Sequence, residues 1–167
     1  MTKNISEQIA AFAAQTAWAD IPADVRHEAK RSLLNYFATA IAGSNEIGMK
    51  KSLSVLAPFA ATGACKIIGR AEQVDMAFAA YLNGVSANIY DFDDTHQETV
   101  IHPTAPIAPA VFAHAEVRPC DGKALLKAFI IGGEIECRIG NAVSPSHYAR
   151  GWHITATCGV FGASAAI

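Results

Sequence analysis

The sequence has little charge and no long apolar run. Only 17% of its 167 residues are Asp, Glu, Lys or Arg, and the formal net charge is −2. The longest basic runs are pairs, Lys30-Arg31 and Lys50-Lys51, so no basic surface for nucleic acid or an anionic membrane is expected. Runs of about eighteen apolar residues are absent, so we expect no membrane-spanning helix.

Closely spaced cysteines are also missing. The four cysteines are Cys65, Cys120, Cys137 and Cys158, and none stands in C-x-x-C spacing. This argues against a zinc ribbon, a thioredoxin-type pair and the usual clustered-cysteine iron–sulfur site. The start of the chain carries no signal-peptide-like apolar stretch. Four free thiols in such a chain predict a reducing, cytoplasmic location, and we expect no cofactor.

Alanine dominates a hydrophobic fraction of 51%, and its spacing is helical along most of the chain. The pattern predicts an all-α fold, a helical bundle, with one short extended segment at 65–69. Pro103 and Pro106 are expected to keep the segment before the fifth helix extended. Loops are expected at 144–147 and 151–153. The predicted helices cover about 4–16, 22–42, 48–60, 75–89, 108–117 and 123–143, and a seventh begins near 154.

A polar, titratable segment interrupts this apolar pattern between Asp91 and His102. Four carboxylates, two imidazoles and two hydroxyls lie within it. Such a concentration of titratable groups inside an apolar helical scaffold is typical of proton-transfer chemistry. The alternative is a solvated loop that merely joins two helices.

Two pairs in this segment are candidates for chemistry. Asp91 and Thr95 are four residues apart and share a face if the fourth helix persists, where they could bind a substrate hydroxyl or move a proton. The alternative is a frayed helix end with ordinary capping. Pro103 holds His102 out of the helical region, which presents the imidazole on an extended backbone. The alternative there is a structural histidine.

A third candidate group follows Gly151. His153 and the hydroxyls of Thr155 and Thr157 stand where the last helix begins. Free N–H groups and partial positive charge at a helix N-terminus favour a carboxylate ligand. The alternative is that Thr155 only caps the helix.

The same acidic segment could also bind a metal ion. Its Asp, Glu and His side chains could bind zinc or manganese. The sequence has neither an H-E-x-x-H motif nor the D-x-D-x-D-G order of a calcium loop. We therefore assign no metal ligands.

The sequence stops inside an apolar, small-residue pattern, residues 158–167, which lacks a helix cap and a polar tail. We interpret residues 1–167 as the N-terminal part of a larger protein.

Several motifs spread over almost the whole chain carry a family resemblance. Together they resemble the MmgE/PrpD family, which includes 2-methylcitrate dehydratase, cis-aconitate decarboxylase and some epimerases. The D-F-D-D-T block followed by H-P is the most specific part. The motifs are Tyr36–Gly43, Cys65–Gly69, Asn83-Gly84, Asp91–Thr95, His102-Pro103, Gly133–Glu136 and Gly151–Thr155.

The resemblance implies a helical domain and a smaller α/β domain with the active site between them, a homodimer, and chemistry without an iron–sulfur cluster. It implies that residues 1–167 are the N-terminal part of the helical domain and that the α/β domain is absent from this chain. Family active-site positions correspond to Asp91, Thr95, His102 and His153, and a further family lysine lies beyond residue 167. We assign a lyase or isomerase acting on a small polycarboxylate, of the 2-methylcitrate dehydration or cis-aconitate decarboxylation type. The alternatives are a truncated, non-catalytic fragment that only folds or dimerises, and a metal-dependent hydrolase. The assigned catalytic residues are Asp91, His102 and His153, and the assigned substrate-binding residues are Thr95, Asp94 and Thr155.

Overall fold

The computed structural model describes residues 4–167, and Met1 to Lys3 lie outside the described residues. Eight α-helices are present in this range, with two short 3-10 helices and one small hairpin. The α-helices are α1 (Ile5–Gln15), α2 (Ala23–Gly43), α3 (Ile47–Leu56), α4 (Met76–Asn88), α5 (Thr104–Val117), α6 (Gly122–Val143), α7 (Ser146–Ala149) and α8 (Ile154–Ala166). The 3-10 helices are Trp18–Asp20 and Ala57–Phe59, and the strands are β1 (Cys65–Lys66) and β2 (Gln73–Val74).

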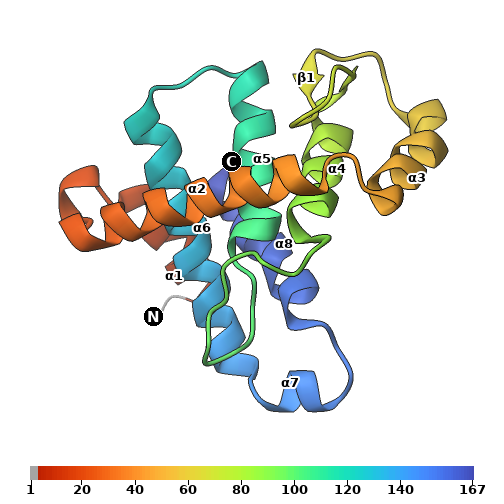
Figure 1. The fold of residues 1–167 in the computed structure, drawn as a ribbon. Coiled ribbons are helices and arrows are strands. Elements are labelled where there is room, and N and C mark those ends of the chain that lie inside the picture. The colour runs from red at the N-terminus through yellow and green to blue at the C-terminus, as the bar shows by residue number, and fades with distance from the viewer. Residues whose placement is uncertain (1–3) are drawn as a thin grey trace.

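The helices pack into a bundle, which confirms the all-α prediction. Helix α6 lies against α8, and α5 packs on α4, α6 and α8. Helix α2 crosses in front of α4, α5 and α6 (Figure 1). The core between them contains Tyr36 of α2, Ile107 and Val111 of α5, and Phe129 of α6. The segment between α4 and α5 leaves the bundle as a long loop and returns to it.

Side-chain caps explain where three of the helices begin. Asn4 and Glu7 form the expected capping box at the start of α1. Asp75 accepts hydrogen bonds from two backbone N–H groups at the start of α4, and Asp121 accepts one at the start of α6. These acceptors satisfy first-turn N–H groups that have no partner within a helix.

Two helices differ from the prediction. Helix α5 begins at Thr104, so Pro106 stands in its first turn and does not keep the chain extended. A proline is tolerated there because first-turn N–H groups have no carbonyl partner within the helix. Part of the expected 144–147 loop forms the single-turn helix α7.

Differences also affect the segments around α3 and the strand. Helix α3 ends at Leu56 and continues as the 3-10 turn. The expected lone extended segment is half of an antiparallel hairpin, in which Cys65 pairs with Val74.

Glycines bring α6 and α8 into close backbone contact. A Cβ atom added at Gly132 would lie 2.8 Å from the carbonyl oxygen of Gly162, and one added at Gly162 would lie 2.8 Å from that of Gly132. Larger residues at these positions would force the helices apart. The close helix contact is made by Gly132, whereas a Cβ atom added at Gly133 would meet nothing within 4 Å. This contact sets the position of α8, whose N-terminus reaches the loop described below.

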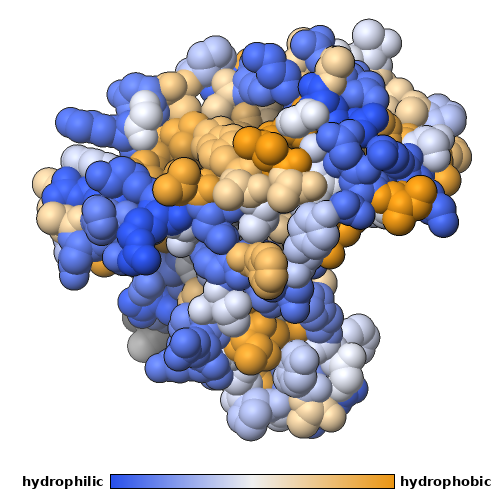
Figure 2. Space-filling view, viewed as in Figure 1, coloured by the Kyte–Doolittle hydropathy of each residue, from blue (hydrophilic) through white to orange (hydrophobic). Residues whose placement is uncertain are grey.

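The surface view shows an apolar area over α2 (Figure 2). Its exposed large side chains include Val25, Leu34 and Ile41, and the side chain of Leu34 is 72% exposed. Among the described residues, no helix combines the length and apolar character that a membrane crossing requires.

Candidate functional site

The acidic segment is a structured loop between α4 and α5. Helix α4 ends at Asn88, so Asp91 and Thr95 do not share a helix face as expected. Asp91 instead adopts a left-handed backbone with φ of 56°, which costs energy for a residue with a Cβ atom and reverses the chain direction. Further along, the backbone N–H of His96 donates to the carbonyl of Ile101 at 2.7 Å and closes the loop.

One aspartate of the loop attaches it to α5. The N-cap of α5 is Pro103, whose side chain makes no cap hydrogen bond. Asp94, which precedes Thr104 by ten residues, caps the helix instead. Its carboxylate accepts hydrogen bonds from the backbone N–H of Thr104 at 3.2 Å and from the Thr104 hydroxyl at 2.5 Å. Both oxygens of Asp94 are thus engaged within the protein. Its assignment to substrate binding stays a prediction, and the observed contacts describe a structural cap.

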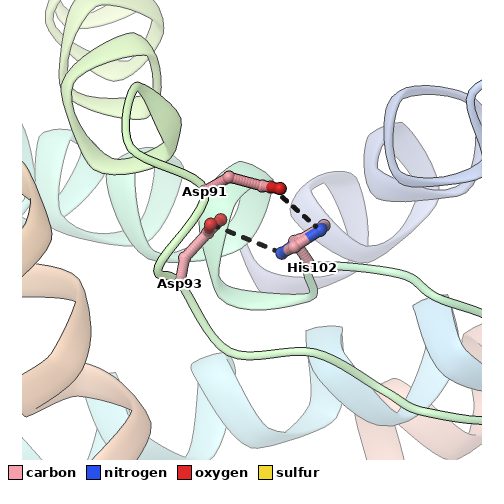
Figure 3. Close-up of side chains that lie close together, drawn as sticks. All are labelled: Asp91, Asp93 and His102. Carbon is pink, nitrogen blue, oxygen red and sulfur yellow. Dashed lines mark ion pairs between the residues drawn. The ribbon is translucent and has the colours of Figure 1, made fainter.

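The imidazole of His102 lies between two carboxylates (Figure 3). Its Nε2 is 3.5 Å from Oδ1 of Asp91, and its Nδ1 is 3.3 Å from Oδ1 of Asp93. The hydroxyl of Thr95 is 3.5 Å from the same Nδ1. The structure therefore brings together Asp91, Thr95 and His102, three of the four positions that the resemblance implied.

The two carboxylates differ in exposure. The side chain of Asp93 is 1% exposed and that of Asp91 is 80% exposed. Burial raises the pKa of the Asp93 carboxyl above its ordinary value, while the Asn88 amide and the nearby His102 oppose that rise. Asn88, the last residue of α4, donates from Nδ2 to both Asp93 oxygens at 3.1 Å.

Helix α8 joins the site through Thr155. The backbone N–H of His102 donates to Oγ1 of Thr155 at 3.1 Å, which connects the loop to the first turn of α8. The Thr155 side chain therefore contacts the loop and does not cap α8. The N-cap position belongs to His153, whose side chain makes no cap hydrogen bond and whose residue is exposed.

A hollow of about 460 Å³ lies beside Thr155, between α4, α5 and α8. His153 and Thr155 line it together with Asn88, which also contacts the Asp93 carboxylate. Its remaining walls are mostly apolar and include Val85, Pro106 and Pro109. The hollow thus places His153 near the residues that hold the His102 loop. That all four expected residues line one pocket stays a prediction.

The spacing of Asp91, Asp93 and His102 would also suit a cation. One ligand-type atom from each lies within 4.8 Å of the others. However, Asp91 faces Nε2 of the ring and Asp93 faces Nδ1 (Figure 3). A cation in line with the lone pair of one ring nitrogen would have only one of these carboxylates beside that nitrogen. We therefore interpret the group as a histidine positioned between two carboxylates and not as a metal centre.

Sequence reasoning missed two residues near this site. Asn88 looked like part of an apolar helix, and nothing in its spacing marks it as a partner of Asp93. Glu136 of α6 is fully buried, and neither carboxyl oxygen has a hydrogen-bond partner among the described residues. Burial first, and the charge of Asp94 second, raise the pKa of Glu136 to about 9. Glu134 and Arg138 are charged residues on the same helix, so the charge of Glu136 did not mark it in the sequence as a buried position.

Comparison with known proteins identifies the family. Residues 7–167 match the MmgE/PrpD N-terminal domain. The chain belongs to the MmgE/PrpD family. The match confirms the resemblance that the D-F-D-D-T block and the H-P dipeptide carried, and it covers the loop, Thr155 and both site histidines.

The MmgE/PrpD chain is also similar to curated proteins. It is 33% identical to a cis-aconitate decarboxylase of Aspergillus terreus over 96% of this chain and 34% of that protein. It is 30% identical to the cis-aconitate decarboxylase-like protein oryM of Aspergillus oryzae, over 98% of this chain and 35% of that protein. A human cis-aconitate decarboxylase is 35% identical over 53% of this chain and 19% of that protein. The chain thus spans about a third of the length of the two Aspergillus relatives.

Proposed function

We propose that this chain provides the His102 half of the active site of an MmgE/PrpD lyase acting on a small polycarboxylate. The observation that carries the proposal is the imidazole of His102 held between Asp91 and Asp93 in a domain of this family. Among the reactions that the family resemblance implies, decarboxylation of cis-aconitate is the first candidate, because the similar curated proteins are named for it. Dehydration of 2-methylcitrate is the second.

The proposed chemistry is proton transfer at a carbon next to a carboxylate. Elimination, decarboxylation and epimerisation all need such a transfer, and a positioned histidine is the usual acid or base. His102 supplies the proton or receives it at the ring nitrogen nearest Asp91. Asp91 is exposed and can therefore meet the substrate directly.

Substrate carboxylates are proposed to bind at the start of α8. The first backbone N–H groups of a helix attract anions, and His153 stands at the N-cap position of this helix. Thr155 is buried, and its hydroxyl accepts a hydrogen bond from the backbone N–H of His102. In this arrangement a carboxylate bound near His153 places the adjacent carbon toward the His102 loop.

The rest of the proposal concerns assembly and location. We propose a homodimer, supported by the apolar side chains exposed on α2, and a cytoplasmic location, supported by four cysteines that are all unpaired. The alternative is a non-catalytic fragment that only folds or dimerises.

The proposal is tested with the protein encoded by the full open reading frame. Purified protein is incubated with cis-aconitate and, separately, with 2-methylcitrate, and carbon dioxide release and dehydration are followed in parallel. Carbon dioxide release that disappears in His102→Ala supports decarboxylation. Dehydration that depends on His102 supports the second candidate. Absence of turnover of both substrates in a folded protein contradicts the proposed enzyme and favours the non-catalytic alternative.

A further inference from the structure

The strongest contact of the His102 ring is with the buried carboxylate of Asp93. The Asp93 side chain is almost completely buried, and its Oδ1 faces Nδ1 at 3.3 Å. Buried charge pairs are screened far less by solvent than exposed pairs. Among the described residues, Nδ1 also lies 3.5 Å from the neutral hydroxyl of Thr95, which is a weaker acceptor than a carboxylate.

Asp93 is itself held in place by Asn88. The Asn88 amide donates to both carboxylate oxygens at 3.1 Å from the last residue of α4. Both contacts come from the single Nδ2 atom of Asn88, so they tie the Asp93 carboxylate to the end of α4. The chain of contacts therefore runs from α4 through Asn88 and Asp93 to the ring.

Asp91 cannot hold the ring in the same way. Its side chain is 80% exposed, and its Oδ1 approaches Nε2 of His102 at 3.5 Å. Exposed ion pairs contribute little to fixed geometry, because solvent competes for both partners. Asp91 therefore lies on the accessible side of the ring, and Asp93 lies on the buried side (Figure 3).

We propose that Asp93, braced by Asn88, is the positioning residue that fixes the His102 ring with a proton on Nδ1, so that Nε2 faces Asp91 and the substrate side. A proton on Nδ1 is favoured because the two groups beside that nitrogen, the Asp93 carboxylate and the Thr95 hydroxyl, both offer acceptor oxygens. In the neutral ring this leaves the lone pair on Nε2, which makes Nε2 the atom that exchanges a proton with substrate. Asp91 is then free to contact substrate, and the two aspartates have different roles.

The inference rests on the proposed function for the proton exchanged at Nε2. The ring orientation and its tautomer do not depend on turnover. They are measured in the chain itself, so that failure of the positioning role and failure of the proposed enzyme give different results.

The test is the tautomer of His102 in the ¹⁵N-labelled chain. Long-range proton–nitrogen NMR spectra distinguish a protonated Nδ1 from a protonated Nε2, and His102→Gln assigns the signals. Spectra are recorded about two pH units above the reference value of histidine, where imidazoles are neutral. The wild-type ring is expected to carry its proton on Nδ1. Asp93→Ala is expected to shift it toward the Nε2-protonated form, which free histidine favours.

Matched variants separate the two carboxylates. Asp91→Ala should leave the Nδ1 proton in place, because Asp91 faces the other nitrogen. Asn88→Ala should produce a smaller shift in the same direction as Asp93→Ala, since it loosens the carboxylate without removing it. Circular dichroism checks each fold, and if Asp93→Ala does not fold, Asn88→Ala decides. A wild-type ring protonated on Nε2, or a tautomer that responds to Asp91→Ala and not to Asp93→Ala or Asn88→Ala, would overturn the proposal.

A kinetic measurement adds the functional consequence in the protein of the full open reading frame. Asp93→Ala should lower kcat on the order of 10²-fold or more with a smaller change in KM, because it disturbs a proton-transfer group and not a substrate contact. A large rise in KM with unchanged kcat would assign Asp93 to substrate binding and contradict the positioning role.

Discussion

The backbone N–H of His102 donates a hydrogen bond to the hydroxyl of Thr155 at 3.1 Å, across 53 residues of sequence. This single contact joins the acidic loop to the first turn of α8. It follows from the close packing of α8 on α6, because Gly132 and Gly162 let the two helix backbones approach. The geometry around His102 therefore depends on Gly132 and Gly162, which have no reactive side chain.

Removing the Thr155 hydroxyl should loosen this connection. Thr155→Val keeps the shape of the side chain but leaves the His102 N–H without its acceptor, which typically costs about 1–3 kcal/mol. Chemical denaturation of the chain measures the loss in the free energy of unfolding. Thr155→Ser is the matched control, because it keeps the hydroxyl and should remain closer to wild type. A larger loss in Thr155→Ser than in Thr155→Val would show that the methyl group, and not the hydrogen bond, stabilises the contact.

Replacement of the proposed proton-transfer group should abolish turnover without unfolding the protein. In the protein of the full open reading frame, His102→Ala is expected to lower the rate on the order of 10²–10⁴-fold. The rate of loss of cis-aconitate or 2-methylcitrate measures this, with circular dichroism as the check of folding. Near-wild-type turnover would move the proton-transfer role to His153 or to a residue outside this chain.

Asp94→Asn provides the comparison for His102→Ala. Its amide still accepts one hydrogen bond from Thr104, so the loss of the carboxylate should lower stability by about 1 kcal/mol, as for other weakened helix caps. Turnover should fall much less than in His102→Ala. A loss of turnover as large as that of His102→Ala, in a folded protein, would restore Asp94 to a direct role with substrate.

The sequence pattern predicted most of the helices but not how the site loop is built. Apolar periodicity and caps such as Asn4 and Asp75 are local signals, and the elements they mark are present. The pairing of Asp94 with Thr104 and of Asn88 with Asp93 depends on a chain reversal at Asp91, whose positive φ is not encoded by a glycine. The predicted start of α5 was also too late, because Pro106 was expected to keep the chain extended. Pro106 lies in the first turn of α5, where a proline is tolerated.

Apolar side chains exposed on α2 predict association of the chain. Val25, Leu34 and Ile41 are all exposed on this helix, and Figure 2 shows the apolar area that lies over it. Light scattering at micromolar concentration should therefore give a mass above that of one 17.6 kDa chain. Leu34→Asn should reduce the association, and Lys30→Gln, on an exposed and polar position of the same helix, should not. A monomeric wild-type chain would contradict the prediction.

The buried Glu136 predicts an unusual dependence of stability on pH. Its pKa is about 9 in the folded protein and starts from an ordinary value of 4.5, because burial in the bundle disfavours the charged form. Below about pH 4.5 the Glu136 carboxyl is neutral in both the folded and the unfolded state, so folding is not coupled to proton uptake by this group. Above it the unfolded chain releases the proton and the folded protein keeps it up to about pH 9. The free energy of unfolding should therefore fall as pH rises through this interval, by at most about 1.4 kcal/mol per unit from this group.

Glu136→Gln removes the titrating group at nearly constant shape. The variant should unfold at higher denaturant concentration than wild type at pH 8, with the two curves approaching each other near pH 5. Glu134→Gln is the matched control, because Glu134 lies two residues earlier on the same helix in a solvent-exposed pair with Arg138. That control should leave the pH slope of stability unchanged. Parallel pH profiles for wild type and Glu136→Gln would mean that the Glu136 carboxyl finds a charged-state partner in solution, and would refute the buried neutral form.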